Sequence, residues 1–457
     1  MEFRSVSSII IFSLILGIII YIELKRKTKI DFLLIYNISY AMFFSIIPIA
    51  TILFPDTLNY GVPANWSYHF ETYHKNLLAS AIFALSFYIV FVLTTRSLEK
   101  KTFALKRIKN NIKYIENDKI FILGIVFLLV GIGSFFIYST TMGGPVNAIR
   151  YAQLKRSGVY ETTGAVTFFK HFIRSVYFAL FVFLTVNSSN NKFKSIKKIL
   201  LVISIVFSII ALLVYSGRAN IIILLTAILL HKGIVNGNVN KKQFVSFGVI
   251  FVAFTIILVF YRPFMLFLSG REVTFAFTDF FASAVTGIIK AFSVPIISLM
   301  VAIEYISINE ISFGTGFLQI FIDVIPKSII GTDLVYTVNN YNTELFGFKL
   351  DSRMYNINAG LLAYFFYEFY WMGVVIGGAI TALVIKILDD WLMILKSNST
   401  LGLMMVYFLF NLPNRILAGD QVGGIKSLLI LYLELMALII LVYKSKKSNV
   451  LIEPNDG

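Results

Sequence analysis

The 457-residue chain contains no cysteine and only four histidines. The absence of cysteine excludes a disulfide scaffold and any metal centre with thiolate ligands. The histidines are scattered along the chain, at His69, His74, His171 and His231, and acidic residues nowhere show the spacing of metal ligands. The sequence therefore predicts neither a bound metal nor another cofactor.

Charged residues are also scarce, at 14% of the chain, whereas a soluble globular protein carries roughly 25%. Hydrophobic residues make up 58%, and the mean hydropathy is +0.82. A single soluble domain has no core large enough for 45 Phe and 24 Tyr side chains. This composition excludes a disordered protein and a soluble enzyme, and it indicates a polytopic membrane protein whose apolar surface the bilayer covers.

Apolar runs close to the roughly 20 residues that cross a bilayer recur along the sequence and predict about 11–12 transmembrane helices. The clear runs are 6–24, 32–53, 76–94, 120–137, 172–186, 199–214, 219–235, 244–261, 360–383, 401–417 and 427–443. The first run is not a cleavable signal peptide, because it is too long and ends in a basic triplet. We expect an all-α polytopic membrane protein with one large extracytoplasmic loop that contains short interfacial or re-entrant helices.

The distribution of basic residues predicts the orientation in the membrane. Of the 40 Lys and Arg residues, 24 lie in six segments that alternate with basic-poor loops. These segments are 25–31, 95–119, 187–198, 232–243, 384–400 and 444–457. Because cytoplasmic loops are enriched in Lys and Arg, we place them in the cytoplasm, with the N-terminus outside and the C-terminus inside. The basic residues form no stripe or basic helix, so nucleic acid is not an expected partner.

This topology divides the chain into four parts. They are transmembrane helices 1–8 in 1–260, the extracytoplasmic loop 261–359, the C-terminal transmembrane helices 360–443 and a cytoplasmic tail 444–457. Within the loop, the apolar stretch 286–306 is interrupted by charges and a proline, so we expect it to re-enter the membrane, to form one arm of a pair or to lie on the surface.

Two further stretches of the loop have a distinct pattern. Apolar residues between 317 and 325 recur at helical spacing and predict an interfacial helix that stops at Pro326. The stretch 332–358 is rich in Asn and Tyr. Aromatic faces stack on sugar rings and amides bond their hydroxyls, so this stretch predicts a binding surface. A solvated loop remains the alternative.

The two predicted sides of the membrane differ in the type of basic residue. Arg accounts for only 3 of the 24 cytoplasmic basic residues but for 9 of the other 16. Arg offers a planar fork that matches phosphate and carboxylate groups, so the split favours an anionic ligand at the outer side. Codon bias and snorkelling of Arg at helix ends would give the same split.

Arg218 is the first candidate for chemistry. It lies in a turn between two apolar runs that are slightly short for two full spans, so we expect the turn to be recessed below the outer surface. There the guanidinium and the N–H groups that begin the next helix would bind a phosphate. Snorkelling to the surface is the alternative.

Glu368 is the second candidate, because it lies inside the apolar run 360–383, where a carboxyl group is costly. It is either a general base or acid, or the partner of an Arg that locks two helices together. In the same run, Gly373 and Gly377 form a GxxxG pair that predicts close helix packing. Arg150, with the basic residues that follow it, forms either an electrostatic capture site for an anionic substrate or an ordinary wet loop.

Three stretches together resemble a known family. They are Ser216-Gly217-Arg218, Ile325-Pro326-Lys327-Ser328, and Asn358-Ala359-Gly360 with the run from Glu368 to Gly373. They resemble the oligosaccharide repeat-unit polymerases, the Wzy-type O-antigen polymerases of bacteria, whose many spans and large outer loop before the last helices also fit. The Arg-to-Gly spacing usual in the outer loops of that family is not evident around Arg150.

The resemblance implies a glycosyltransferase at the outer face of the bacterial inner (plasma) membrane. It would join repeat units carried on undecaprenyl pyrophosphate into a surface polysaccharide of the cell envelope, either the O-antigen of lipopolysaccharide or a capsule. Its partners would be the undecaprenyl-pyrophosphate-linked oligosaccharide, membrane lipids and, in the cell, flippase and chain-length regulator proteins.

In such an enzyme we expect Arg218 to hold the pyrophosphate and Glu368 to serve as the base or to orient an Arg. The candidate substrate-binding residues are Arg150, Arg262, Arg271, Lys327, Arg353 and Tyr355.

Two other functions remain open. An O-antigen ligase-like glycosyltransferase would share almost every feature and differ in its acceptor. A flippase or transporter of lipid-linked oligosaccharide would show pseudo-repeats and a central path of charges, and the sequence shows neither a fixed repeat nor an inverted pair of broken helices.

The topology can be tested with single cysteines, because the chain has none of its own. A membrane-impermeant maleimide should label Asn340→Cys in intact cells, since 332–358 is predicted to lie outside. Lys101→Cys, in the predicted cytoplasmic segment 95–119, is the matched control and should react only after the membrane is breached. The opposite pattern would contradict this orientation.

Overall fold

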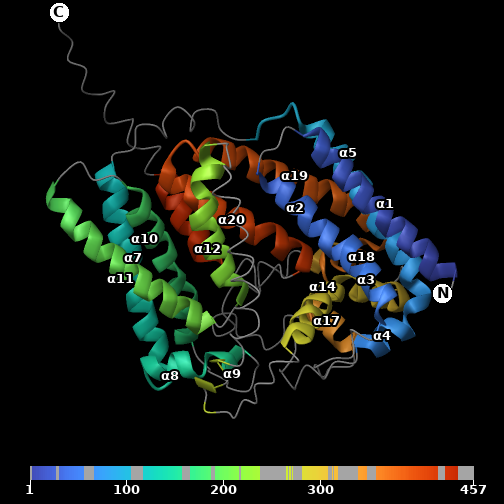
Figure 1. The fold of residues 1–457 in the computed structure, drawn as a ribbon, viewed down its shortest axis with the longest axis horizontal. Helices are drawn as coiled ribbons and strands as arrows, with labels where there is room; N and C mark the ends of the chain where they lie inside the picture. Colours follow the sequence, from blue (N-terminus) through green and yellow to red (C-terminus); the bar gives the residue numbers. More distant parts are fainter. Residues whose placement is uncertain are drawn as a thin grey trace, which may run out of the picture. The chain divides into compact units, whose positions relative to one another are not determined.

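The computed structural model describes residues 3–26, 30–55, 66–103, 117–156, 165–186, 191–215, 218–236, 264–265, 267–268, 270, 280–306, 311, 313–316, 338–346, 357–419 and 428–440. Within these ranges every regular element is a helix (Figure 1). Eight of the described helices are long and apolar enough to cross a membrane. The chain is therefore an all-α, multi-pass membrane protein, as the sequence predicts.

The predicted spans coincide with described helices, apart from 244–261, which lies outside the described residues. Two of them, at 219–235 and 427–443, correspond to shorter apolar helices, Asn220–Val235 and Leu428–Ile440. The predicted interfacial helix at 317–325 also lies outside the described residues.

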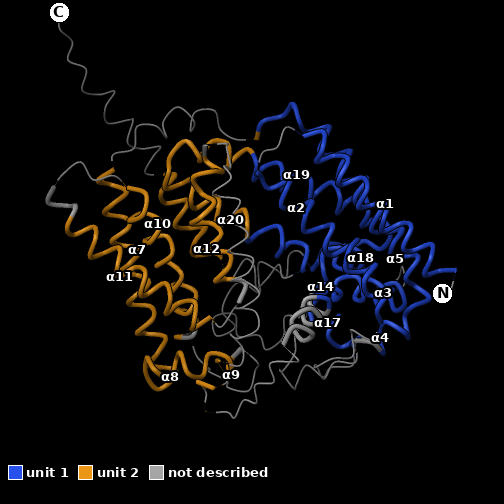
Figure 2. The backbone as a smooth tube through the Cα atoms, in the orientation of Figure 1, with its two compact units in different colours: residues 1–102, 274–389, 411–424 blue, residues 103–273, 390–410, 425–457 orange. Residues whose placement is uncertain are grey.

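Cα packing divides the chain into two compact units, which are coloured in Figure 2 and described separately below. Unit 1 comprises residues 1–102, 274–389 and 411–424, and unit 2 comprises 103–273, 390–410 and 425–457. Neither unit is one continuous stretch, because α19 (Gly373–Leu395) and α20 (Ser399–Ala418) each begin in one unit and end in the other.

Unit 1 begins with α1 (Phe3–Lys25), which packs against α5 (Leu77–Leu98). The predicted span 32–53 is interrupted. It consists of α2 (Phe32–Ala41), the π-helical segment η1 (Met42–Ile46) and α3 (Ile47–Leu53). Phe44 leaves the helical region there, with φ −123° and ψ 20°. A π-helical turn commonly marks a functional or strained point in a helix.

The apolar stretch 286–306 belongs to one helix of 26 residues, α14 (Phe280–Tyr305), which continues through Pro295. It packs among α3, α5 and α18 of unit 1, and the residues from Ile296 to Ala302 are buried. Most of the described side chains of this stretch are therefore covered by neighbouring helices of unit 1. At its end, Glu304 forms an ion pair with Lys75 at 2.6 Å, beside η3 (His74–Asn76) and α4 (Trp66–Thr72).

The short helix α17 (Val338–Leu345) carries three buried polar side chains that hold the chain before α18. Thr343 Oγ1 accepts a hydrogen bond from Ile357 N at 2.8 Å, and Asn342 Nδ2 donates to Ile357 O at 3.0 Å. Asn339 Oδ1 accepts from Ala359 N at 2.9 Å. Because 357–360 is not helical, its backbone groups need such partners inside an apolar protein.

The predicted binding surface at 332–358 is therefore wrong for Asn339 and Asn342. Both amides are buried and bonded inside unit 1, where Asn342 also accepts from Tyr367 OH at 2.9 Å. Amide side chains suit sugar recognition and internal backbone bonding equally, and only burial separates the two uses. The residues at 332–337 and 347–356 lie outside the described part of the chain.

The predicted span 360–383 is likewise broken. After α18 (Leu361–Phe369), Tyr370 adopts a left-handed conformation with φ 53° and ψ −139°, and η8 (Tyr370–Met372) leads into α19. A Cβ at Gly373 would lie 2.4 Å from Phe365 O, and one at Gly377 would lie 2.5 Å from the Phe365 ring. The two glycines therefore provide the close packing that GxxxG predicts, here between α18 and α19 folded back on each other.

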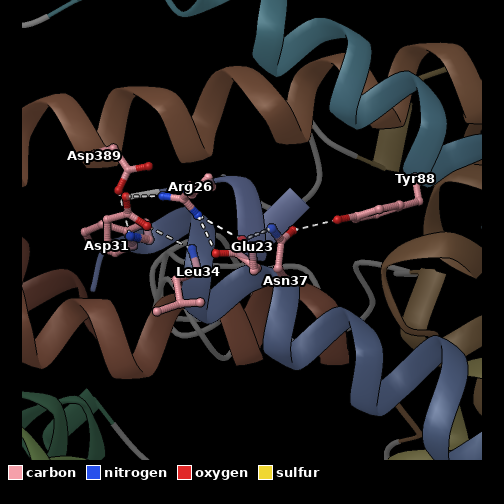
Figure 3. A network of polar contacts seen from close by, with 8 residues as sticks. Glu23, Arg26, Asp31, Leu34, Asn37, Tyr88 and Asp389 are labelled. Carbon is pink, nitrogen blue, oxygen red and sulfur yellow. Dashed lines mark hydrogen bonds and ion pairs between the residues drawn. The ribbon is translucent and has the colours of Figure 1, made fainter. Parts of the chain in front are cut away.

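An ionic network joins the end of α1 to the start of α2 (Figure 3). Arg26 Nη1 donates to both carboxylate oxygens of Glu23, at 2.9 and 3.1 Å, and Nη2 donates to Asp31. Asp31 is also the N-cap of α2, since its Oδ1 accepts from Leu34 N at 2.9 Å.

The same network reaches two further helices (Figure 3). Asp389 of α19 accepts from Phe32 N at 2.6 Å and adds a second carboxylate to the positive end of α2. Asn37 Nδ2 donates to Glu23 at 2.5 Å, and its Oδ1 accepts from Tyr88 OH of α5 at 3.0 Å. The network thus joins α1, α2, α5 and the part of α19 that belongs to unit 1.

Unit 2 contains α7 (Asn117–Thr140), the 3₁₀ helix η5 (Ala165–Arg174) that continues into α10 (Ser175–Thr185), α11 (Asn191–Tyr215) and α12 (Arg218–Asn236). α7 packs against η5 and α10, and α10 packs against α11. A Cβ at Gly124 would lie 2.6 Å from Val182, and one at Gly131 would lie 2.5 Å from Val176. Small residues at these positions allow close helix packing.

An added methyl group at Gly360 in unit 1 would meet both a close contact and an unfavourable backbone conformation. A Cβ there would lie 2.6 Å from Pro295 Cβ and 2.9 Å from Pro295 Cα, and φ is +78°. Gly360→Ala should lower the free energy of unfolding by about 1–3 kcal/mol through overpacking and strain, measured by thermal unfolding in detergent. Gly17→Ala in α1 is the control, because its Cβ would meet nothing within 4 Å. Equal stability of the two variants would contradict the close contact.

Candidate functional site

Basic and aromatic side chains gather at one end of unit 2. Tyr138 comes from the last turn of α7, Lys155 from α9 (Ala152–Arg156), Lys170 and Arg174 from η5, and Tyr215 is the last residue of α11. These five residues are called the basic cluster below. α8 (Pro145–Arg150) and α9 pack against α11 beside it.

Each cation of the cluster lies over a tyrosine ring. Lys155 Nζ is 4.8 Å from the centroid of Tyr138, and Arg174 Cζ is 3.8 Å from that of Tyr215. Lys170 Nζ lies 5.8 Å from the first centroid and 5.3 Å from the second. These distances are within the roughly 6 Å over which a ring face attracts a cation. The two rings therefore hold three cations close together.

Local backbone geometry builds this end of the unit. Gly143 and Gly144 have φ of +75° and +118°, and Pro145 then begins α8, so the chain reverses directly after α7. η5 runs for 10 residues in the 3₁₀ conformation, whereas such runs rarely exceed about 3–4 residues. Tyr215 OH donates to Lys170 O at 2.6 Å and fixes the ring against η5.

Burial affects the cations of the cluster differently. Lys155 is half-buried, and desolvation lowers its pKa to about 8. Arg174 is only 2% exposed, so it is withdrawn from water further than Lys155. An array of this kind suits an anion with several oxygens, because a guanidinium bonds two of them at once and ammonium groups add charge without fixed geometry.

Arg218 lies at the same end of unit 2 as the basic cluster. It is the first residue of α12, and α11 ends at Tyr215, so the predicted hairpin is correct. The recess argued from helix length is not supported, because α11 starts at Asn191 and its 25 residues are enough for a full span. The side chain of Arg218 lies outside the described part.

Arg150 closes α8 at this end as well. Its guanidinium is exposed, Nε donates to Leu268 O at 3.0 Å, and Cζ lies 6.0 Å from the Tyr151 centroid. The structure thus brings Arg150 and Arg218 to one end of unit 2. The other predicted substrate-binding residues lie outside the described part of the chain: Arg262, Arg271, Lys327, Arg353 and Tyr355.

Glu368 belongs to unit 1, on the last turn of α18, and is fully buried. Its Oε2 accepts a hydrogen bond from Gly316 N at 3.3 Å, and a Cβ at Gly316 would lie 1.8 Å from its Oε1. Glu368 therefore lies two residues before the strained Tyr370. Its carboxyl packs against Gly316, where there is no space for a side chain. The sequence placed Glu368 inside an apolar run but did not predict the helix break beside it.

A second buried carboxyl escaped the sequence analysis. Glu434, on the helix Leu428–Ile440 of unit 2, is 7% exposed. The signal was the one that identified Glu368, a single acidic residue inside an apolar run. Within the described residues, no group of three or more His, Asp and Glu side chains is arranged to hold a metal ion.

Comparisons of this chain with protein families, with curated proteins and with solved structures find no match. Its candidate function therefore rests on the arrangement of its own residues.

The half-buried Lys155 provides a test of the cluster. Since burial lowers its pKa to about 8, the amine becomes neutral and nucleophilic as the pH rises through that value. Its acylation by a water-soluble ester, followed by peptide mass spectrometry, should therefore rise with a midpoint near pH 8. Exposed Lys101 is the internal reference for reagent reactivity. A midpoint above 10 would contradict the burial of this side chain.

Proposed function

We propose that the protein is a lipid-linked glycan polymerase of the bacterial cytoplasmic membrane, with its N-terminus outside, its C-terminus inside and the basic cluster at the outer face. One observation carries the proposal. Lys155, Lys170 and Arg174 are held over two tyrosine rings at the end of unit 2 where Arg218 begins α12. The substrate class that fits is an oligosaccharide on undecaprenyl pyrophosphate, destined for an O-antigen or a capsule.

Glycosyl transfer from a lipid-linked donor requires few groups from the protein beyond those of the basic cluster. The anomeric carbon of the donor sugar already carries a pyrophosphate leaving group, and cations placed around that group stabilise the charge that develops as it departs. A rigid site for the donor also removes much of the entropic cost of bringing two lipid-linked substrates together. Arg218 is the proposed bidentate contact to the pyrophosphate, and Arg150 the outermost contact.

A transporter of the same lipid-linked substrate is the second candidate. Unit 1 contains two interrupted helices, at η1 between α2 and α3 and at Tyr370 between α18 and α19, and Glu368 is buried beside the second. Many transporters place discontinuous helices and a buried charge at their substrate site. This geometry favours transport over a ligase as the alternative.

Deletion of the gene, followed by sizing of the surface glycan, separates the candidate functions. A polymerase is expected to leave single repeat units on the surface and no longer chains. Chains of normal length that stay on the carrier lipid would instead indicate a ligase. Repeat units trapped in the cytoplasm would indicate a transporter.

Substitution of Arg218 tests the proposed contact. Arg218→Lys keeps the charge and loses the planar fork. A charge-assisted hydrogen bond contributes about 1.5–3 kcal/mol, so loss of one or two in the transition state should slow transfer by about tenfold or more. Polymer length should fall nearly as far as with Arg218→Ala, measured at matched protein level.

Arg96→Lys is the matched control, because Arg96 is exposed in the last turn of α5 in unit 1. It should leave polymer length unchanged. Normal polymer from Arg218→Lys would make Arg218 a structural or snorkelling residue.

A further inference from the structure

Two buried carboxyls of unit 2, those of Asp390 and Glu434, have no role in the proposal above, and Asp390 accepts a hydrogen bond from Phe103 N at 2.9 Å. Glu434 is 7% exposed, and its Oε2 makes no hydrogen bond to any described residue. Ser175 Oγ faces the carboxyl but is also buried without a well-formed hydrogen bond in the described structure. Leaving such oxygens unsatisfied is costly, and native proteins rarely do so without a functional reason.

The position of Glu434 relative to the basic cluster follows from the chain. Ser175 is the first residue of α10, directly after Arg174, which ends η5 over the Tyr215 ring. The carboxyl that faces Ser175 therefore lies at the helix turn that also carries a cation of the cluster. Glu368, in contrast, belongs to unit 1.

The helix that carries Glu434 is rigidly packed. Tyr432 stacks on Phe408 of α20, with centroids 4.9 Å apart and planes at 2°, and Phe408 contacts Phe178 of α10 at 6.0 Å. The two aromatic contacts hold Leu428–Ile440 against the helices on which the cluster depends. A fixed position is what a group that handles a proton requires.

We propose that Glu434 is the general base of unit 2, an inference that rests on the proposed glycosyl transfer. The acceptor hydroxyl oxygen forms a bond to the anomeric carbon of the donor as the bond from that carbon to the pyrophosphate oxygen breaks. The hydroxyl proton passes to the Glu434 carboxylate and later to water. The bonding electrons leave with the undecaprenyl pyrophosphate, whose charge the basic cluster holds. Ser175 is a positioning residue for the carboxyl.

The test uses the purified full-length protein and repeat units linked to undecaprenyl pyrophosphate, extracted from the deletion strain. Glu434→Gln keeps the shape and the neutral hydrogen bonding of a protonated carboxyl but cannot accept a proton. We expect kcat for chain extension to fall by about 100-fold or more, the usual contribution of a general base, while KM for the donor changes less than threefold. Glu434→Asp, which retains a carboxyl, should recover part of that loss.

Two controls keep the outcomes distinct. Glu99→Gln, at an exposed position just after α5, should keep the wild-type kcat, and thermal unfolding in detergent shows whether Glu434→Gln is folded. A folded Glu434→Gln with wild-type kcat overturns the inference and leaves the polymerase proposal standing, because a structural carboxyl tolerates Gln. Absence of chain extension by the wild-type protein overturns both.

Discussion

A polar group inside an apolar helical protein must form its hydrogen bonds with other groups of the protein. The architecture of unit 1 depends on the hydrogen bonds that the backbone of residues 357–360 forms. That segment is not helical, so its amides cannot bond to one another. Asn339, Asn342 and Thr343 of α17 supply the partners instead. Because they do, residues 357–360 can lack regular structure and still lead into α18 inside the unit, with Gly360 against Pro295.

The same constraint accounts for the placement of charge in unit 1. Near Arg26 the network contains three carboxylates, and the side chain of Arg26 satisfies only two of them. Asp389 instead caps α2, where the free N–H groups of the first turn accept a negative charge. The network therefore fixes where α2 starts relative to α19. The strain at Tyr370, between α18 and α19, is tolerated because hydrogen bonds fix the segment before α18 and the Asp389 side of α19.

The sequence predicts what depends on local composition. Hydropathy located every described span, and the sequence also located the turn before Arg218. Each of these features can be recognised from a short stretch of consecutive residues. The breaks were not predictable, since Tyr370 departs from the helix only where Phe365 packs on Gly373 and Gly377. Likewise, the first turns of α11 are polar. The predicted apolar run therefore begins only at residue 199 and misses the eight helical residues that start at Asn191.

The candidate site residues also differ in whether local composition or three-dimensional packing reveals them. Arg218 was singled out by the turn in which it lies, and Arg150 by the basic residues that follow it. The cations that lie over Tyr138 and Tyr215 are instead Lys155, Lys170 and Arg174, and their placement depends on how α7, α9, η5 and α11 pack. The amides of α17 were misinterpreted because sugar-binding and backbone-bonding asparagines have the same composition. Glu434 carried the same signal as Glu368, and only its burial beside Ser175 distinguishes it from a residue at a helix end.

Burial within the basic cluster affects lysine and arginine differently. A lysine loses charge as it is buried, and Lys155, with its pKa lowered to about 8, is already partly neutral in slightly alkaline conditions. A guanidinium resists the loss of its proton far better than an ammonium group, and Arg174 occupies the most buried cationic position of the cluster, at 2% exposure over the Tyr215 ring. Permanent positive charge in a poorly solvated place is therefore better supplied by arginine than by lysine. Burial accounts for the arginine at 174 but not for every arginine of the chain, because the side chains of Arg4 and Arg150 are exposed.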